Sequence, residues 1–127
     1  MRILLDTRAV VWYLDGNERL LPNHRHLIVD SRNDVFVSTA TLWELAIKIS
    51  TGKLETPKSL SEILATLQKQ GFDILPIMPG HTLQVTALPF HHRDPFDRIL
   101  IAQALVEHLS LITYDDAFKS YGVKVLQ

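Results

Sequence analysis

The 127-residue sequence contains no cysteine. A disulfide scaffold, a zinc–cysteine module and a thiol nucleophile are therefore excluded, and the composition is compatible with a reducing compartment. Neither charge is in large excess, because 13 basic residues stand against 14 acidic ones. This balance excludes a globally basic nucleic-acid-binding protein, so any contact with nucleic acid must be local.

Long apolar runs are also missing. A membrane-spanning helix needs about 20 apolar residues, and charged side chains interrupt every candidate stretch in this sequence. A signal peptide is not expected, because Asp6 falls inside the segment that would have to be its apolar part. The sequence therefore predicts a cytoplasmic protein with no membrane association. Its length predicts a single domain, residues 1–127, with one hydrophobic core.

Short apolar segments alternate with segments of helical periodicity. Strands are expected at Arg2–Leu5, Val35–Ser38, Phe72–Pro76 and Ser110–Thr113, with a fifth at Val123–Leu126. Continuous apolar strands are typical of a parallel sheet covered on both faces. Helices are expected at Ala9–Leu14, Pro22–Asp30, Ala40–Thr51, Leu60–Gln70, His81–Leu88 and Pro95–Leu109. This order predicts an α/β fold in which helices sandwich a mainly parallel sheet of four to five strands.

The positions of the acidic residues are the most informative feature. Asp6 directly follows the first expected strand and Asp115 the fourth. The carboxyl ends of parallel strands meet at one edge of a sheet, where α/β proteins bind ligands. Glu44 lies on an otherwise apolar helical segment that should face the core, where an unpaired carboxylate would be costly. Asp97 lies in the first turn of the last long helix, on the same face as Asp94.

A cluster of Asp6, Glu44, Asp97 and Asp115 would repel itself strongly, and a divalent cation would relieve that repulsion. Carboxylate oxygens suit Mg²⁺ or Mn²⁺, which retain several waters and leave room for phosphate oxygens. Two such ions about 4 Å apart activate a water and stabilise the leaving oxygen in phosphodiester hydrolysis. The cluster therefore predicts a metal-dependent phosphodiesterase.

Every acid also has a structural explanation. Glu44 could form an ion pair with Lys48, one helical turn further on. Five acids are placed to cap a helix or to complement its dipole: Asp6, Asp94, Asp97, Asp115 and Asp116. The combination still favours a functional site, because acids after two strands and near two helix starts would all fall at one edge of the sheet.

These motifs resemble those of the PIN-domain nucleases and, among them, of the VapC-like toxins of bacterial toxin–antitoxin pairs. The resemblance extends over nearly the whole chain. It rests on four segments in order, Leu4–Thr7, Ser38–Lys48, His92–Ala104 and Leu111–Asp115, the last of them followed closely by Ala117 and Phe118. The four acids stand 38, 53 and 18 residues apart, and this ordered set is far more specific than any one motif.

The resemblance implies a Mg²⁺- or Mn²⁺-dependent endoribonuclease that is inhibited by a cognate antitoxin. It also implies a homodimer that contacts DNA only through the antitoxin. The metal and catalytic residues implied are Asp6, Glu44, Asp97 and Asp115. Residues expected to support them or to contact substrate are Thr7, Arg8, Asp94, Thr113 and Asp116. Similar toxins often have His where this chain has Arg8, whose guanidinium suits a phosphate instead.

Other side chains near these motifs have two interpretations each. Candidate RNA contacts are Lys48, Lys53, Arg93 and Arg98, although a solvated or ion-paired side chain is the more frequent role of such residues. Core or dimer packing is favoured over base stacking for four residues, Trp12, Tyr13, Leu14 and Trp43. His91 and His92 lie before the Asp94 cap and could be metal ligands, but no pair of histidines has the spacing of a zinc-binding helix, so both are expected to be loop residues.

Two other classes of function fit the predicted fold. A phosphoryl-transfer domain of the haloacid-dehalogenase type requires an acid two residues after its nucleophile, where this chain has Arg8. A receiver-like domain has its paired acids early in the chain, whereas Asp115 and Asp116 come late. A non-catalytic interaction module would bind metal without turnover. The four acids together favour the nuclease over both.

Overall fold

A four-stranded parallel sheet forms the centre of the molecule. The structure is a computed structural model that describes residues 1–127. Its strands are β1 (Arg2–Leu5), β2 (Asp34–Ser38), β3 (Asp73–Leu75) and β4 (Ser110–Ile112), in the order β3-β2-β1-β4. Central β1 pairs with β2 on one side and β4 on the other. The predicted α/β class and parallel sheet are confirmed.

Six helices occupy the segments between the strands, as the periodicity predicts, and a short 3₁₀ helix follows the last strand. They are α1 (Thr7–Asp15), α2 (Pro22–Val29), α3 (Thr39–Ser50), α4 (Leu60–Lys69), α5 (Pro79–Ala87), α6 (Pro95–Glu107) and the 3₁₀ helix η1 (Asp116–Tyr121). The Ser59 hydroxyl and the Glu62 carboxylate cap the start of α4 reciprocally. None of the helices combines the length and the apolar character needed to cross a membrane.

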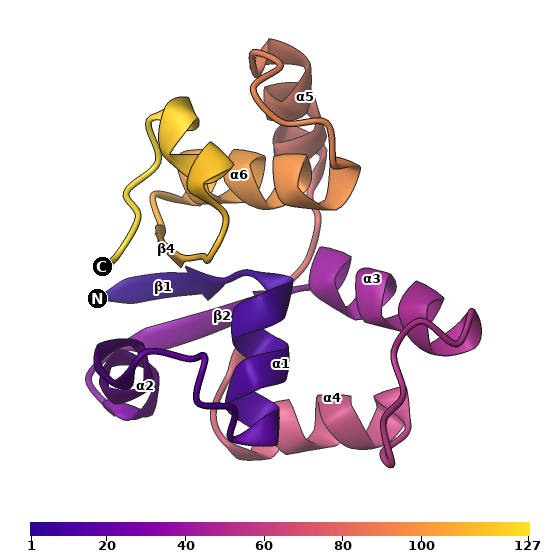
Figure 1. Ribbon diagram of the computed structural model, residues 1–127. Helices are drawn as coiled ribbons and strands as arrows, with labels where there is room; N and C mark the ends of the chain where they lie inside the picture. Colours follow the sequence, from indigo (N-terminus) through magenta and orange to yellow (C-terminus); the bar gives the residue numbers. More distant parts are fainter.

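The helices cover both faces of the sheet (Figure 1). Because side chains alternate along a strand, Ile3 and Leu5 pack with α1, α2 and α4, whereas Leu4 packs with α6 and η1 on the other face. All three side chains are completely buried. Central strand β1 therefore has no solvated face, which explains why its sequence is continuously apolar.

The expected fifth strand is the one part of the predicted sheet that does not form. Val123–Leu126 makes only an isolated bridge, between Val125 and Leu111. The segment leaves η1 through Gly122, whose φ of 76° is in the left-handed region, and it meets β4 at Leu111 alone. The sheet therefore has four strands.

Replacing Leu111 with alanine tests how far the core on the α6 side of the sheet depends on β4. Leu111 is completely buried, so Leu111→Ala should lower the free energy of unfolding by about 2–5 kcal/mol. The same truncation at Leu83, which is 70% exposed on α5, should change it by less than about 0.5 kcal/mol. Urea unfolding followed by circular dichroism measures both, and equal effects of the two variants would contradict this packing.

Candidate metal centre

A pocket of about 280 Å³ opens at the carboxyl edge of the sheet. Strand β1 leads directly into α1 there, and β2 leads into α3. The four predicted ligand acids all line this pocket, together with Asp94. The acids come from four separate parts of the chain: Asp6, Glu44, Asp97 and Asp115. The fold thus brings together residues up to 109 positions apart in the sequence.

Two backbone amides fix the carboxylate of Asp6. Its Oδ1 accepts a hydrogen bond from the Ala9 amide at 2.8 Å, and its Oδ2 accepts one from the Tyr114 amide at 3.2 Å. Asp6 therefore caps α1, as its structural explanation predicts, while also facing the pocket. Burial raises the pKa of this carboxyl, and hydrogen bonds from the Ala9 amide, the Thr113 hydroxyl and the Tyr114 amide partly oppose the rise. Three donors leave at least one of the four acceptor positions of the carboxylate for a cation.

Glu44 is held by a threonine and a lysine. Thr7 Oγ1 donates to Glu44 Oε1 at 2.6 Å, and Lys48 Nζ lies 3.0 Å from Oε2. The alternative of an ion pair with Lys48 is thus confirmed as a contact, but Glu44 lines the pocket at the same time. Only 13% of the Glu44 side chain is exposed, so the lysine offsets part of the cost of burying this charge.

The start of α6 places Asp97 beside a second acid. Asp94 caps the helix, and its Oδ1 accepts hydrogen bonds from the amides of Phe96 at 2.8 Å and Asp97 at 3.2 Å. The pKa of Asp97 is raised to about 6, first by burial and then by the negative charge of Asp94, with smaller contributions from Glu44 and Asp6. The pocket is therefore short of positive charge, and its oxygen-rich donor set fits a divalent cation such as Mg²⁺ or Mn²⁺.

His92 contacts the site, although the sequence favours a loop residue over a ligand at this position. It lies in a loop, as expected, but its Nε2 is 2.7 Å from Asp97 Oδ2 and 2.9 Å from Asp115 Oδ2. These three ligand atoms all lie within 4.8 Å of one another. The available signal was the position of His92 two residues before the Asp94 cap, since a residue just ahead of a helix start can fold back over the first turn.

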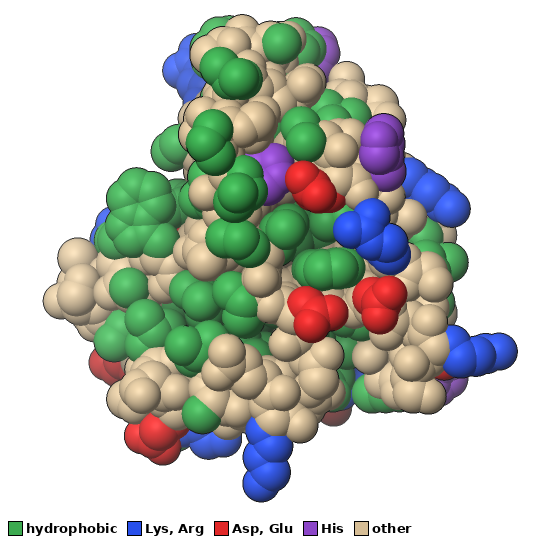
Figure 2. Space-filling view, turned by 180° about the vertical axis from the view of Figure 1, so that it is seen from behind, with side chains coloured by type: hydrophobic (Ala, Val, Ile, Leu, Met, Phe, Trp, Pro, Cys, Tyr) green, Lys and Arg blue, Asp and Glu red, His purple; other side chains and the backbone are tan.

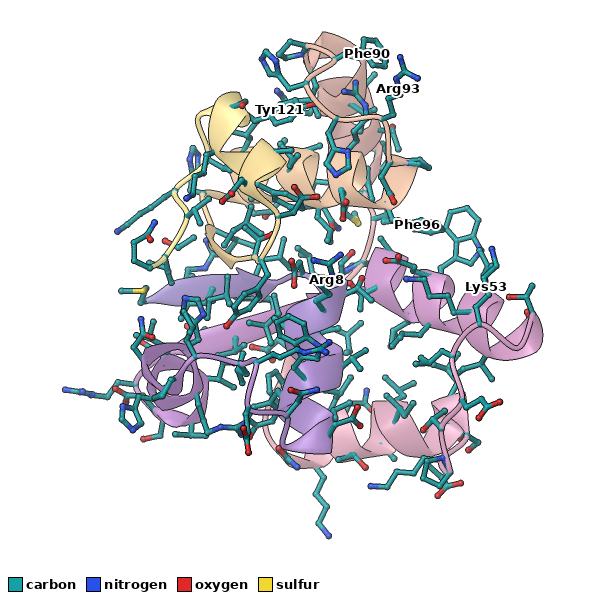
Figure 3. All side chains as sticks on the ribbon, viewed as in Figure 1. Arg8, Lys53, Phe90, Arg93, Phe96 and Tyr121 are labelled. Atoms are coloured by element: carbon teal, nitrogen blue, oxygen red, sulfur yellow. The ribbon has the colours of Figure 1, made fainter.

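The expected supporting residues are only partly brought to the pocket. Thr7 and Arg8 line it, and Arg8 stands at the start of α1 between the sheet and α6 (Figure 3). Thr113 does not line it but contacts two of its acids: its Oγ1 accepts the Asp115 amide at 3.1 Å, and its hydroxyl lowers the pKa of Asp6 by a hydrogen bond. Asp116 does not line it either, since its side chain is 96% exposed and lies 3.3 Å from Lys119.

Arg98 is wrong as a candidate RNA contact. It is buried, and its guanidinium donates to the carbonyls of Pro89 at 2.9 Å and Leu88 at 3.4 Å. Two other candidates are exposed (Figure 3): Lys53 lies in the turn that follows α3, and Arg93 lies in the loop before α6.

The aromatic residues divide between core and surface. Trp12 packs edge-on against Tyr114 with ring centroids 4.8 Å apart, in the core that the sequence predicts. Trp43 does not enter the core: it is 60% exposed and contacts Phe96 at 5.1 Å. The expectation that its whole segment faces inward was wrong, because the periodicity of α3 buries Leu45 and turns Trp43 outward.

Replacing Asp97 with asparagine should stabilise the metal-free protein. An acid whose pKa is raised by folding destabilises the folded state as the pH rises from its ordinary pKa through the raised value of about 6. Near neutral pH, Asp97→Asn should therefore raise the melting temperature in chelator by ~2–5 °C. The difference should vanish below about pH 4. Asp116→Asn, at an exposed position, is the control, and a melting temperature of Asp97→Asn at or below wild type near neutral pH would contradict the charge repulsion.

Comparison with known proteins agrees with this fold. The chain is similar to the crystal structure of VapBC2 from Rickettsia felis bound to a DNA fragment from their promoter (TM-score 0.75, 18% identity, 100% of this chain and 98% of that one). It is similar to FitAcB from Neisseria gonorrhoeae (TM-score 0.71, 24% identity, 98% of this chain and 96% of that one). It is also similar to VapBC-5 from Mycobacterium tuberculosis, a member of the VapBC family of toxin–antitoxin systems (TM-score 0.60, 24% identity, 99% of this chain and 98% of that one).

The similar structures show the fold alone, because they are at most 24% identical to this chain in sequence. The family is assigned from a match to a protein-family model. No curated protein matches the chain in sequence. The model of the PIN domain, however, matches residues 3–124, which include all four predicted ligand acids. The chain therefore belongs to the PIN domain family.

Proposed function

We propose that this protein is a metal-dependent endoribonuclease, the toxin of a toxin–antitoxin pair. The observation that carries the proposal is the convergence of Asp6, Glu44, Asp97 and Asp115 on one pocket. The raised pKa of Asp97 supports it, because such a cluster gains most when a divalent cation neutralises it. Membership of the PIN family and the likeness to VapBC structures agree with the same activity.

In the proposed site, some residues would bind the cation and others would contact the substrate. A bound Mg²⁺ or Mn²⁺ would supply a water of lowered pKa and offset the charge of a phosphodiester. Asp6 and Asp97 anchor the cation, and Glu44 and Asp115 complete the ligand set. The two amides on Asp6 hold it in place, as Thr7 and Lys48 hold Glu44, so the carboxylates need little rearrangement to bind.

Positively charged side chains around the pocket favour RNA as the substrate. Arg8 lines the pocket, and its planar guanidinium suits a phosphate oxygen pair. Lys53 and Arg93 are exposed and free to contact phosphates further along the chain of nucleotides. These contacts are few and scattered, as expected of an enzyme that recognises the shape of an unpaired RNA segment and not a long duplex.

Cleavage of total cellular RNA tests the activity. Wild type should give discrete products with Mg²⁺ or Mn²⁺ and none with chelator. Asp97→Asn and Glu44→Gln, which remove one charge each at nearly constant shape, should lower the rate by at least about 100-fold.

Asp116→Asn is the matched control for these variants, because this acid lies outside the pocket. It should cleave like wild type. Equal cleavage by wild type, Asp97→Asn and Glu44→Gln would refute the site. Metal binding by the wild type with no cleavage would favour a non-catalytic interaction module, and trapping of an aspartyl-phosphate would favour a phosphoryl-transfer domain.

A groove between α1, α3 and α4 is the proposed antitoxin site. It has a volume of about 270 Å³ and adjoins the acidic pocket, with Val11, Leu45 and Leu54 lining both. A partner segment with apolar side chains in the groove and a basic side chain at its end would reach the carboxylates. Such a segment would block substrate and satisfy the acids at once, which is how we propose that the antitoxin inhibits cleavage.

A second apolar surface is the proposed homodimer interface. Trp43 and Phe96 border a groove of about 340 Å³ that Ile77, Val85 and Ile99 also line. Hydrophobic side chains run from α5 toward the α3 side of the molecule on this face (Figure 2). Exposed apolar area of this kind is typical of a protein–protein interface.

Two matched substitutions should separate the two surfaces. Leu54→Asp places a charge in the antitoxin groove and should abolish copurification of the antitoxin from the native host, while leaving the dimer intact. Trp43→Asp should do the reverse, giving a monomer by light scattering that still binds the antitoxin. Loss of both associations in one variant, or of neither, would contradict the assignment of separate surfaces.

A further inference from the structure

The hydrogen bonds around His92 indicate the tautomer of its ring. The Asp94 amide donates to His92 Nδ1 at 3.3 Å, and a backbone N–H can only donate, so Nδ1 carries no proton. The ring proton of the neutral imidazole is therefore on Nε2. This N–H points at Asp97 Oδ2 and Asp115 Oδ2, and 19% of the His92 side chain is exposed.

The loop that carries His92 is held by a buried arginine. Arg98 is 6% exposed and has no carboxylate partner; its donors go to backbone carbonyls of this loop and of the end of α5 and to the Tyr121 hydroxyl. The same hydroxyl accepts the His92 amide at 2.7 Å. Tyr121 lies on η1 facing the segment of Phe90 and Arg93 (Figure 3). A buried cation satisfied only by neutral acceptors is costly, and here it fixes the backbone that places His92.

We infer that His92 is a catalytic residue that donates its Nε2 hydrogen to a phosphate oxygen of the substrate. The inference rests on the proposed nuclease function. Asp97 and Asp115, which share this hydrogen, are also two of the four proposed metal ligands. A cation bound by these carboxylates would withdraw their negative charge and make them weaker acceptors, so an oxygen of an arriving phosphodiester becomes the better acceptor for the Nε2 hydrogen.

The alternative role for His92 is a nitrogen ligand of the metal. Ligation by Nε2 would move the ring proton to Nδ1, where it would face the Asp94 amide, so that two donors would oppose each other across 3.3 Å. Metal-binding histidines instead direct their second N–H at an acceptor. The contacts around the ring therefore favour a donor to substrate over a ligand.

Three variants distinguish these roles by activity and metal affinity. His92→Ala should lower kcat for RNA cleavage at least about tenfold, with Mn²⁺ and Mg²⁺ affinities by calorimetry within about twofold of wild type. His92→Gln, which restores an N–H donor near the same place, should recover most of the loss. His26→Ala, at an exposed histidine of α2 outside the pocket, should behave like wild type. A large loss of metal affinity in His92→Ala, or unchanged kcat, would overturn the inference.

A spectroscopic measurement keeps this test separate from that of the nuclease activity. In ¹⁵N-histidine-labelled protein with Mg²⁺, His92 should remain protonated on Nε2, and the Nε2 resonance should shift when dimethyl phosphate, a simple phosphodiester anion, is added. A deprotonated Nε2 with Mg²⁺, or no response to dimethyl phosphate, would overturn the inference even if wild type cleaves RNA. Failure of wild type to cleave RNA would instead refute the proposed function, and the response of Nε2 to dimethyl phosphate would then show phosphate binding without catalysis.

Discussion

Mutual repulsion of the carboxylates at the carboxyl edge of the sheet is the constraint on which the site depends. In the metal-free protein the pKa of Asp97 rises to about 6, because burial and the neighbouring acids disfavour its charged form. Lys48 and His92 relieve part of this repulsion from the protein's own side chains. A divalent cation in the pocket would relieve the same repulsion.

The fold keeps these acids close by giving most of them a structural role as well. Asp6 caps α1, Asp94 caps α6 and Asp115 caps η1, so helix starts and pocket are built by the same carboxylates. Strand β1 is buried on both faces, and this packing holds in place the strand end that Asp6 directly follows. The structural and the functional explanation of these acids are therefore not alternatives, because the same carboxylates cap helices and line the pocket.

The sequence is informative where local pattern decides the outcome. Continuous apolar runs and helix periodicity predict the four strands and six helices, and strand ends predict the convergence of Asp6 and Asp115. Tertiary contacts decide the rest. Val123–Leu126 meets β4 at one residue only. Arg98 is buried and donates to the carbonyls of Pro89 and Leu88, which the spacing of residues in the sequence does not predict. His92 reaches the acids because Arg98 and Tyr121 position its loop, which is likewise a contact between distant residues.

An anomalous difference map from crystals grown with Mn²⁺ tests the central claim most directly, because it locates the ion without reference to activity. The account predicts a peak in the pocket within coordination distance of the Asp6 and Asp97 carboxylates, with Glu44 and Asp115 beside it and His92 Nε2 outside the ligand shell. A map with no peak in this pocket, or with its peak at another group of acids, would contradict the account.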